Sequence, residues 1–167
     1  METTYFNGTP VHTYGTMPRA GQKAPDFKLV TPELKEVTLD DYKGRRVVLN
    51  IFPSLDTEVC AMSVRRFNQE AAALDNTAVL CVSMDLPFAA GRFCTAHGIK
   101  DVTPASAFRS PEFAKEYGLQ IVDGPLAGLL ARAVIVIDEK GEVIYSELVD
   151  EITHEPHYDE ALDVLKK

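Results

Sequence analysis

Three cysteines, at positions 60, 81 and 94, are the residues with the widest chemical scope in the sequence. A thiolate is a nucleophile and a metal ligand, whereas a thiol buried among apolar side chains is inert. The count is odd, and a chain of 167 residues can bury a sizeable core without covalent cross-links. The cysteines therefore exclude a structural disulfide framework, and leave catalytic chemistry, regulatory chemistry or none.

Cys60 lies at the junction between an expected strand and an expected helix. Residues 46–52 form a short apolar run rich in β-branched side chains, and Pro53 ends it, as is typical of a buried strand. Asp56 or Thr57 can serve as the N-cap of the next helix, which places Cys60 in its first turn. Unpaired N–H groups and the helix dipole stabilise a thiolate there, the Thr57 hydroxyl is within reach, and Pro53 is expected to exclude water. Because Cys60 also belongs to the apolar stripe of its helix, an inert buried thiol is the alternative.

The other two cysteines carry weaker signals. Cys81 lies in the apolar run 79–82 and is interpreted as a core residue, with no chemistry assigned to it. Cys94 lies on a separate expected helix, where its spacing alone favours a buried helix cysteine. Cys94 and His97 have the spacing of metal ligands, but structural zinc sites normally use paired short motifs and this chain has one. We therefore expect neither a metal nor a cofactor, and interpret His97 as a helix C-terminal cation or a solvated side chain.

Charge and the absence of other motifs exclude several functional classes. Seventeen Lys and Arg against 25 Asp and Glu give a net charge of −8, which repels nucleic acids and anionic membranes. There is no C-x-x-C pair of a dithiol oxidoreductase and no nucleotide-binding, zinc-protease or serine-hydrolase motif. The pairs Asp40-Asp41 and Asp150-Glu151 are interpreted as solvated loop charges. No apolar run reaches the roughly 18 residues of a membrane helix, and residues 1–10 do not resemble an export signal, so we expect a cytosolic protein.

The elements that position Cys60 are expected to form one α/β domain over residues 1–167. Asn7-Gly8 predicts an N-terminal hairpin, and residues 16–25 predict an extended connector, so that residues 1–25 precede the main body. The order that follows is β-α-β-α and then β-β-α, which is that of a thioredoxin-like three-layer α/β/α sandwich. The expected strands cover 46–52, 79–84, 133–137 and 143–149, and the expected helices run from the cap before Cys60 to about Asp75-Asn76 and over 87–97, 111–116 and 157–167.

Pro53, Thr57 and Cys60 match the P-x-x-x-T-x-x-C signature of the peroxiredoxins. The segment PSLDTEVC at 53–60 resembles more narrowly the bacterial thiol peroxidase subgroup, which are atypical two-cysteine peroxiredoxins. Further segments resemble that subgroup in the same order, and the similarity extends over nearly the whole chain; they are SMDLPF at 83–88, RFC at 92–94 and GLLARAV at 128–134.

The resemblance implies thioredoxin-dependent reduction of hydrogen peroxide and organic hydroperoxides, in antioxidant defence. It implies that Cys60 is the peroxidatic thiolate, which becomes a sulfenic acid, and that Thr57 holds both sulfur and substrate through its hydroxyl. Arg132 would place a permanent positive charge beside the sulfur, although by itself it would be interpreted as a surface arginine paired with an acid. Cys94 would form an intramolecular disulfide with Cys60, which thioredoxin reduces, and the usual assembly is a homodimer.

Two other functional classes are less well supported by the sequence. A metal-binding protein would use Cys94 and His97 with a further ligand, and a non-catalytic thioredoxin-fold interaction protein would not need Thr57, Cys60 and Arg132 together. The sequence does not decide which peroxide is preferred. Five apolar residues could form a wall that binds organic hydroperoxides, but packing in the core explains the same residues equally well. This set is Leu86, Phe88, Leu126, Leu129 and Leu130.

Overall fold

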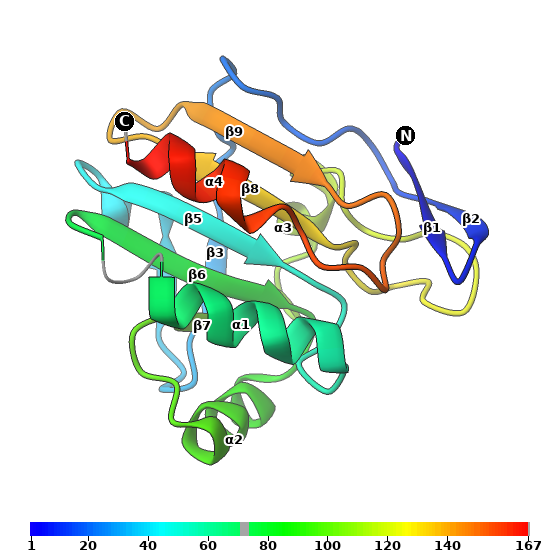
Figure 1. Cartoon of the computed structure of the whole chain (residues 1–167), viewed down its shortest axis with the longest axis horizontal. Coiled ribbons are helices and arrows are strands. Elements are labelled where there is room, and N and C mark those ends of the chain that lie inside the picture. The colour runs from blue at the N-terminus through cyan, green and yellow to red at the C-terminus, as the bar shows by residue number, and fades with distance from the viewer. Residues whose placement is uncertain (71–73, 167) are drawn as a thin grey trace.

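The computed structural model describes residues 1–70 and 74–166, and its central feature is a seven-stranded sheet (Figure 1). Along the chain the strands are β3 (Lys28–Val30), β4 (Glu36–Thr38), β5 (Arg46–Ile51), β6 (Thr77–Ser83), β7 (Thr103–Ser106), β8 (Ala133–Ile137) and β9 (Val143–Leu148). Their order in the sheet is β4-β3-β7-β6-β5-β8-β9. β5, β6 and β7 run parallel, and the pairs β5–β8, β8–β9, β3–β7 and β3–β4 are antiparallel.

The two central strands are apolar because both faces of the sheet are covered. Successive side chains of a strand point to opposite faces, so Val48 and Leu49 of β5 enter two different cores. In the same way Cys81 faces one core and Leu80 of β6 faces the other. The interpretation of Cys81 as a core residue is confirmed, since it is buried between the sheet and the helices.

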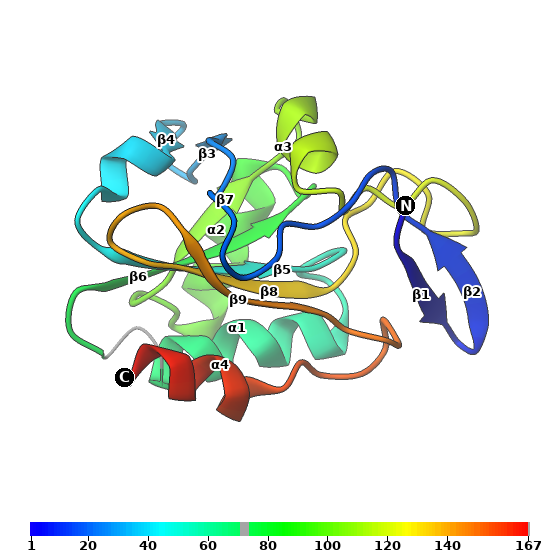
Figure 2. The same ribbon diagram turned by 90° about the horizontal axis from the view of Figure 1, so that it is seen from above.

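The helices complete three layers. α1 (Glu58–Glu70), α2 (Pro87–His97) and α4 (Tyr158–Leu165) pack on the face that contains Cys81, where the rings of Phe67 and Tyr158 meet edge to face at 5.4 Å. α3 (Pro111–Glu116) packs on the opposite face, and Figure 2 shows α1 and α4 on one side of the sheet and α3 on the other. The predicted thioredoxin-like α/β/α sandwich is therefore confirmed. Within the described residues, no helix has the length and apolarity needed to cross a membrane.

The N-terminal hairpin has the turn that the sequence predicts. β1 (Thr3–Phe6) pairs antiparallel with β2 (Thr9–His12), and the turn between them has φ values of 52° at Asn7 and 83° at Gly8. Backbone bonds join β1 to the chain that follows β9, from the N–H of Tyr5 to the Asp150 carbonyl and from the N–H of Ile152 to the Tyr5 carbonyl, both at 2.8 Å. We infer that the hairpin and its connector belong to the same domain as the sheet.

Several sequence predictions of single elements are confirmed, and others are wrong. α2 spans the predicted residues and is capped by Gly98, whose φ of 64° suits a residue without Cβ. The sequence missed β3, β4, β7 and the 3₁₀ helix η1 (Leu39–Tyr42), because segments of three or four residues have too few side chains to show a period. The predicted helix end near Asp75-Asn76 is wrong, since a turn with a φ of 54° at Asn76 leads into β6; Ala71, also assigned to that helix, and the terminal Lys167 lie outside the described residues.

Candidate active site

The Cys60 sulfur lies under the loop that leads from β5 into α1. Pro53 is buried where the strand ends, and Cys60 is the third residue of the helix and fully buried. Thr57 immediately precedes the helix, with its carbonyl accepting the Ala61 N–H at 3.0 Å and its hydroxyl donating to the Ser54 carbonyl at 3.1 Å. The thiol therefore lies in the first turn of α1, where the positive end of the helix favours negative charge.

The guanidinium of Arg132 is a second source of positive charge near the Cys60 sulfur, in addition to the helix N-terminus. It directly precedes β8, the strand that pairs with β5, and this pairing brings its side chain beneath the first turn of α1. Its Nη2 donates to the Cys60 Sγ at 3.1 Å and its Nε to the Ile152 carbonyl at 2.7 Å, whereas Nη1 has no partner among the described residues. The side chain is 2% exposed, so the interpretation of Arg132 as a surface arginine is wrong.

Among the residues that the structure describes, no carboxylate forms an ion pair with this guanidinium. An unpaired buried cation is costly, and the nearest group that can become an anion is the Cys60 thiol. The guanidinium is therefore placed to stabilise negative charge that forms on this sulfur during a reaction.

A pocket of about 250 Å³ opens above the guanidinium. Its wall includes Pro53, Thr57 and Arg132, the three residues that the sequence grouped with Cys60, and its other lining side chains are mostly apolar. Of the side chains expected to form an apolar wall, Leu126 and Leu129 line this pocket. The remaining three belong elsewhere, because Leu130 is buried in the opposite core and Leu86 and Phe88 are exposed at the start of α2.

Cys94 and Cys81 have environments that keep them protonated. Burial raises the pKa of the Cys81 thiol to about 12, with the Asn50 amide opposing the shift and the nearby Cys94 adding to it. Burial, followed by the charge of Glu33, also raises the pKa of Cys94, which is partly buried on α2. Cys94 packs against the core that contains Cys60, but all three cysteines are free thiols.

Comparisons with known proteins agree with this geometry. Residues 19–162 match the Redoxin family. A thiol peroxidase from Corynebacterium glutamicum is 56% identical over 165 residues, which cover 99% of each chain. The chain belongs to the thiol peroxidases of the Redoxin family.

Solved structures of this family show the same fold. A peroxiredoxin-like protein from Aquifex aeolicus aligns with a TM-score of 0.94 and 42% identity, covering 99% of this chain and 96% of its own. A thiol peroxidase from Chromobacterium violaceum aligns over 98% of this chain and 95% of its own, with a TM-score of 0.88 at 22% identity. The resemblance found in the sequence is confirmed.

Asp85 supports the loop beside Cys60, and the sequence analysis did not identify it. Its carboxylate accepts the Ser54 hydroxyl at 2.9 Å, the Leu55 N–H at 2.7 Å and the Ser83 hydroxyl at 2.7 Å. These bonds fix the loop that carries Pro53 and Thr57. The position of Asp85, two residues after a buried parallel strand, was the available signal, because the carboxyl ends of such strands share one edge of the sheet.

The hypothesis that Cys94 and His97 bind a metal ion is not supported by the surroundings of His97. The His97 ring packs against Phe93 with 4.4 Å between ring centroids, and its Nδ1 lies 3.5 Å from Arg65 Nη1. Over residues 1–70 and 74–166, no group of three His, Cys, Asp or Glu side chains is arranged to hold a metal ion.

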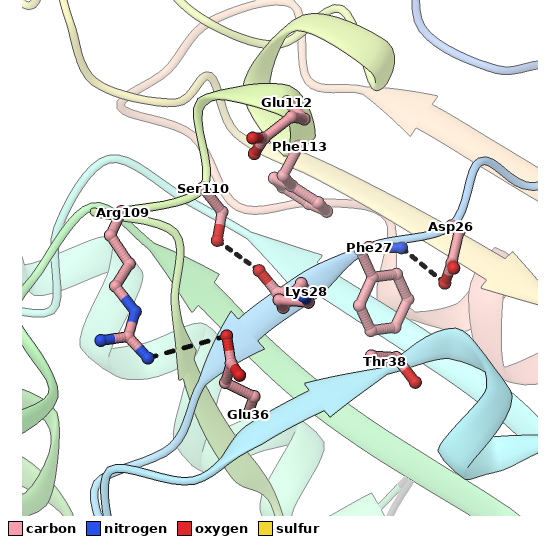
Figure 3. Close-up of a pocket in the computed structure, with 9 residues that line it drawn as sticks. All are labelled: Asp26, Phe27, Lys28, Glu36, Thr38, Arg109, Ser110, Glu112 and Phe113. Atoms are coloured by element: carbon pink, nitrogen blue, oxygen red, sulfur yellow. Dashed lines mark hydrogen bonds and ion pairs between the residues drawn. The ribbon is translucent and has the colours of Figure 1, made fainter.

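A second pocket, of about 300 Å³, lies between β3, β4 and α3 (Figure 3). Two pairs of its polar groups are in contact, since Arg109 lies 3.7 Å from Glu36 and Asp26 accepts the Phe27 N–H at 2.8 Å. The buried polar atoms that lack partners in the described chain belong to other residues. This pocket contributes no residue to the Cys60 site.

Proposed function

We propose that the chain reduces hydrogen peroxide and organic hydroperoxides, with Cys60 as the attacking nucleophile. The observation that carries this proposal is the contact, at 3.1 Å, between the Cys60 sulfur and the buried guanidinium of Arg132, which pairs with no carboxylate in the described part of the chain. A non-catalytic interaction protein would have no use for this unbalanced charge beside a thiol. Membership of the thiol peroxidases supports the same chemistry.

The attack of the Cys60 thiolate on one peroxide oxygen forms a sulfur–oxygen bond and breaks the oxygen–oxygen bond. The cysteine is oxidised to a sulfenic acid, and the departing oxygen takes a proton and leaves as water or an alcohol. Nη1 of Arg132 has no partner among the described residues, and we propose it as a donor to the negative charge that develops on the oxygens. Thr57 gives its own hydroxyl proton to Ser54, so its lone pairs are the acceptor for the peroxide O–H.

Organic hydroperoxides fit the apolar walls of the pocket. Phe6, Leu126 and Leu129 contribute side chains that have no hydrogen bonds to offer to a polar substrate. An alkyl group bound here would displace water from these surfaces, which favours binding by about 25 cal/mol for each Å² that is buried. Because hydrogen peroxide is smaller, we expect it to enter the same pocket.

We propose Cys94 as the resolving cysteine. Its thiolate attacks the Cys60 sulfenic acid, a disulfide forms, and hydroxide leaves and becomes water. Burial disfavours the Cys94 thiolate in the folded state, and a disulfide needs Cα atoms within about 7 Å, so the turns around both cysteines must unwind locally. Thioredoxin then supplies the two electrons that restore both thiols.

The assembly that we propose is a homodimer, formed in a reducing compartment such as the cytosol. Leu86, Phe88 and Phe108 are 45%, 69% and 62% exposed and follow β6 and β7 at the carboxyl edge of the sheet. Large exposed apolar side chains that lie together favour association.

Sedimentation velocity should therefore give the mass of a dimer for the wild type and of a monomer for Phe88→Glu, and a monomeric wild type would contradict this assembly.

The proposed function is tested by mixing the reduced chain anaerobically with one equivalent of hydrogen peroxide. Two of the three thiols should disappear, and a peptide map should show a Cys60–Cys94 disulfide with Cys81 still free. An unchanged peroxide concentration would overturn the proposed function. A disulfide that contains Cys81 would overturn only the assignment of Cys94.

A further inference from the structure

The orientation of the Arg132 guanidinium depends on one backbone oxygen. Its Nε donates to the Ile152 carbonyl at 2.7 Å, and its only other hydrogen bond in the described chain is the one from Nη2 to the Cys60 sulfur. The guanidinium is planar and rigid, with Nε and Nη2 along one edge, so fixing the direction of Nε also fixes the direction of Nη2. A shift of the Ile152 carbonyl would therefore move the charge away from the sulfur.

Residues 149–153, which carry Ile152, belong to no helix and are held by the N-terminal hairpin. The fully buried Thr4 hydroxyl lies 2.8 Å from both the Val149 and the Asp150 carbonyl oxygens. Tyr5 contributes its N–H and its carbonyl to the same segment, as described above. In Figure 1 the hairpin lies beside the chain that leaves β9. Tyr5 also forms an isolated parallel bridge with Glu151.

The Glu151 side chain also joins residues 149–153 to the N-terminal hairpin, at the turn of the hairpin. Its carboxylate accepts the N–H of Asn7 at 2.6 Å and the N–H of Gly8 at 3.3 Å, and it also accepts the Thr153 hydroxyl at 2.9 Å. Desolvation raises the pKa of Glu151, but these hydrogen bonds outweigh it and hold the pKa below its ordinary value. Glu151 is therefore a loop carboxylate that, besides its exposure to solvent, accepts hydrogen bonds from three groups.

We propose that Glu151 is a positioning residue for Arg132, acting through the hairpin turn and the adjacent Ile152 carbonyl. Charge-assisted bonds from a carboxylate to two neighbouring N–H groups are stronger than neutral ones and fix the residue that bears them. Because Ile152 is the next residue in the chain, the same bonds fix the carbonyl that orients Nε. The inference rests on the proposed function only in assigning a catalytic task to the contact between Arg132 and Cys60.

The test measures the reactivity of Cys60 without using peroxide. The reduced full-length chain is alkylated with iodoacetamide between pH 5 and 9, and the extent at each cysteine is read by mass spectrometry. We expect Glu151→Ala to shift the Cys60 profile to higher pH and to slow alkylation at pH 7 by about tenfold. Glu151→Gln, which keeps one acceptor oxygen, should lie between Glu151→Ala and the wild type. Glu139→Ala, which removes an equal charge from an exposed site, should match the wild type.

Two comparisons separate this inference from its alternatives. Arg132→Lys keeps the charge but loses the planar edge, and it should shift the Cys60 profile at least as far as Glu151→Ala. If Arg132→Lys shifts the profile and neither Glu151 variant does, the positioning role is overturned and the proposed function stands. If Arg132→Lys leaves the profile unchanged, the role of Arg132 in the proposed function fails.

General loosening of the fold would give a different pattern. Alkylation of Cys94 and Cys81 would then rise together with the change at Cys60, and this result would also overturn the inference. Should Glu151→Ala fail to fold, the intermediate shift expected for Glu151→Gln decides the question.

Discussion

Cys60→Ser is expected to reduce peroxide consumption to less than about one-thousandth of the wild-type rate, because the nucleophile is an anion. A serine hydroxyl stays protonated at neutral pH even when a guanidinium lies beside it, so the variant has no thiolate to attack the oxygen–oxygen bond. The other two thiols cannot replace it, since burial raises the pKa of both Cys81 and Cys94. The measurement is the initial rate of peroxide loss with a thioredoxin reductant in excess.

Cys81→Ser is the matched control for this prediction. It removes one thiol of the same chain, and its hydroxyl can keep the contact that the Cys81 sulfur makes with the Asn50 amide at 3.8 Å. We expect this variant to keep most of the wild-type rate. Substantial peroxide loss by Cys60→Ser, or a collapse in Cys81→Ser, would place the chemistry at a different sulfur.

The position of Cys60 could be predicted because its determinants are local. An apolar β-branched run, a proline and a capping residue lie within fifteen residues of the thiol, and each acts on the backbone near it. α2 is predictable for the same reason, with Pro87 at its first turn and Gly98 at its end. The short strands β3, β4 and β7 are stabilised by hydrogen bonds to neighbouring strands, and not by their own side-chain pattern. β7 contains Pro104, a residue that is unfavourable in strands. Such strands cannot be predicted from the segment itself.

The surroundings of the sulfur are nonlocal and were therefore harder to predict. Arg132 is 72 positions from Cys60, and only the pairing of β5 with β8 brings it inside the molecule. Without the family resemblance, its sequence context indicated an exposed arginine. Glu151 lies 144 positions from Asn7, so its part in the site becomes visible only when the hairpin is seen against the chain after β9.

Cys94→Ser is expected to separate the two halves of the catalytic cycle. Attack on peroxide needs only the Cys60 thiolate, so the variant should still consume about one equivalent of peroxide for each chain. Without a resolving thiol the sulfenic acid persists, and further peroxide oxidises it to sulfinic and sulfonic acids, which thioredoxin does not reduce. Turnover driven by thioredoxin should therefore fall at least about a hundredfold, although the first turnover stays fast.

The checks on Cys94→Ser are a rapid-mixing measurement of the first turnover and the intact mass of the chain after excess peroxide. The wild type should gain no oxygen and lose two hydrogens on disulfide formation, whereas the variant should gain two or three oxygens at Cys60. In the wild type, amide exchange around Cys60 and Cys94 should also accelerate on oxidation, because the disulfide requires both helices to open. Sustained thioredoxin-driven turnover by Cys94→Ser would mean that a reductant reaches the Cys60 sulfenic acid directly, and the chain would then work as a one-cysteine peroxidase.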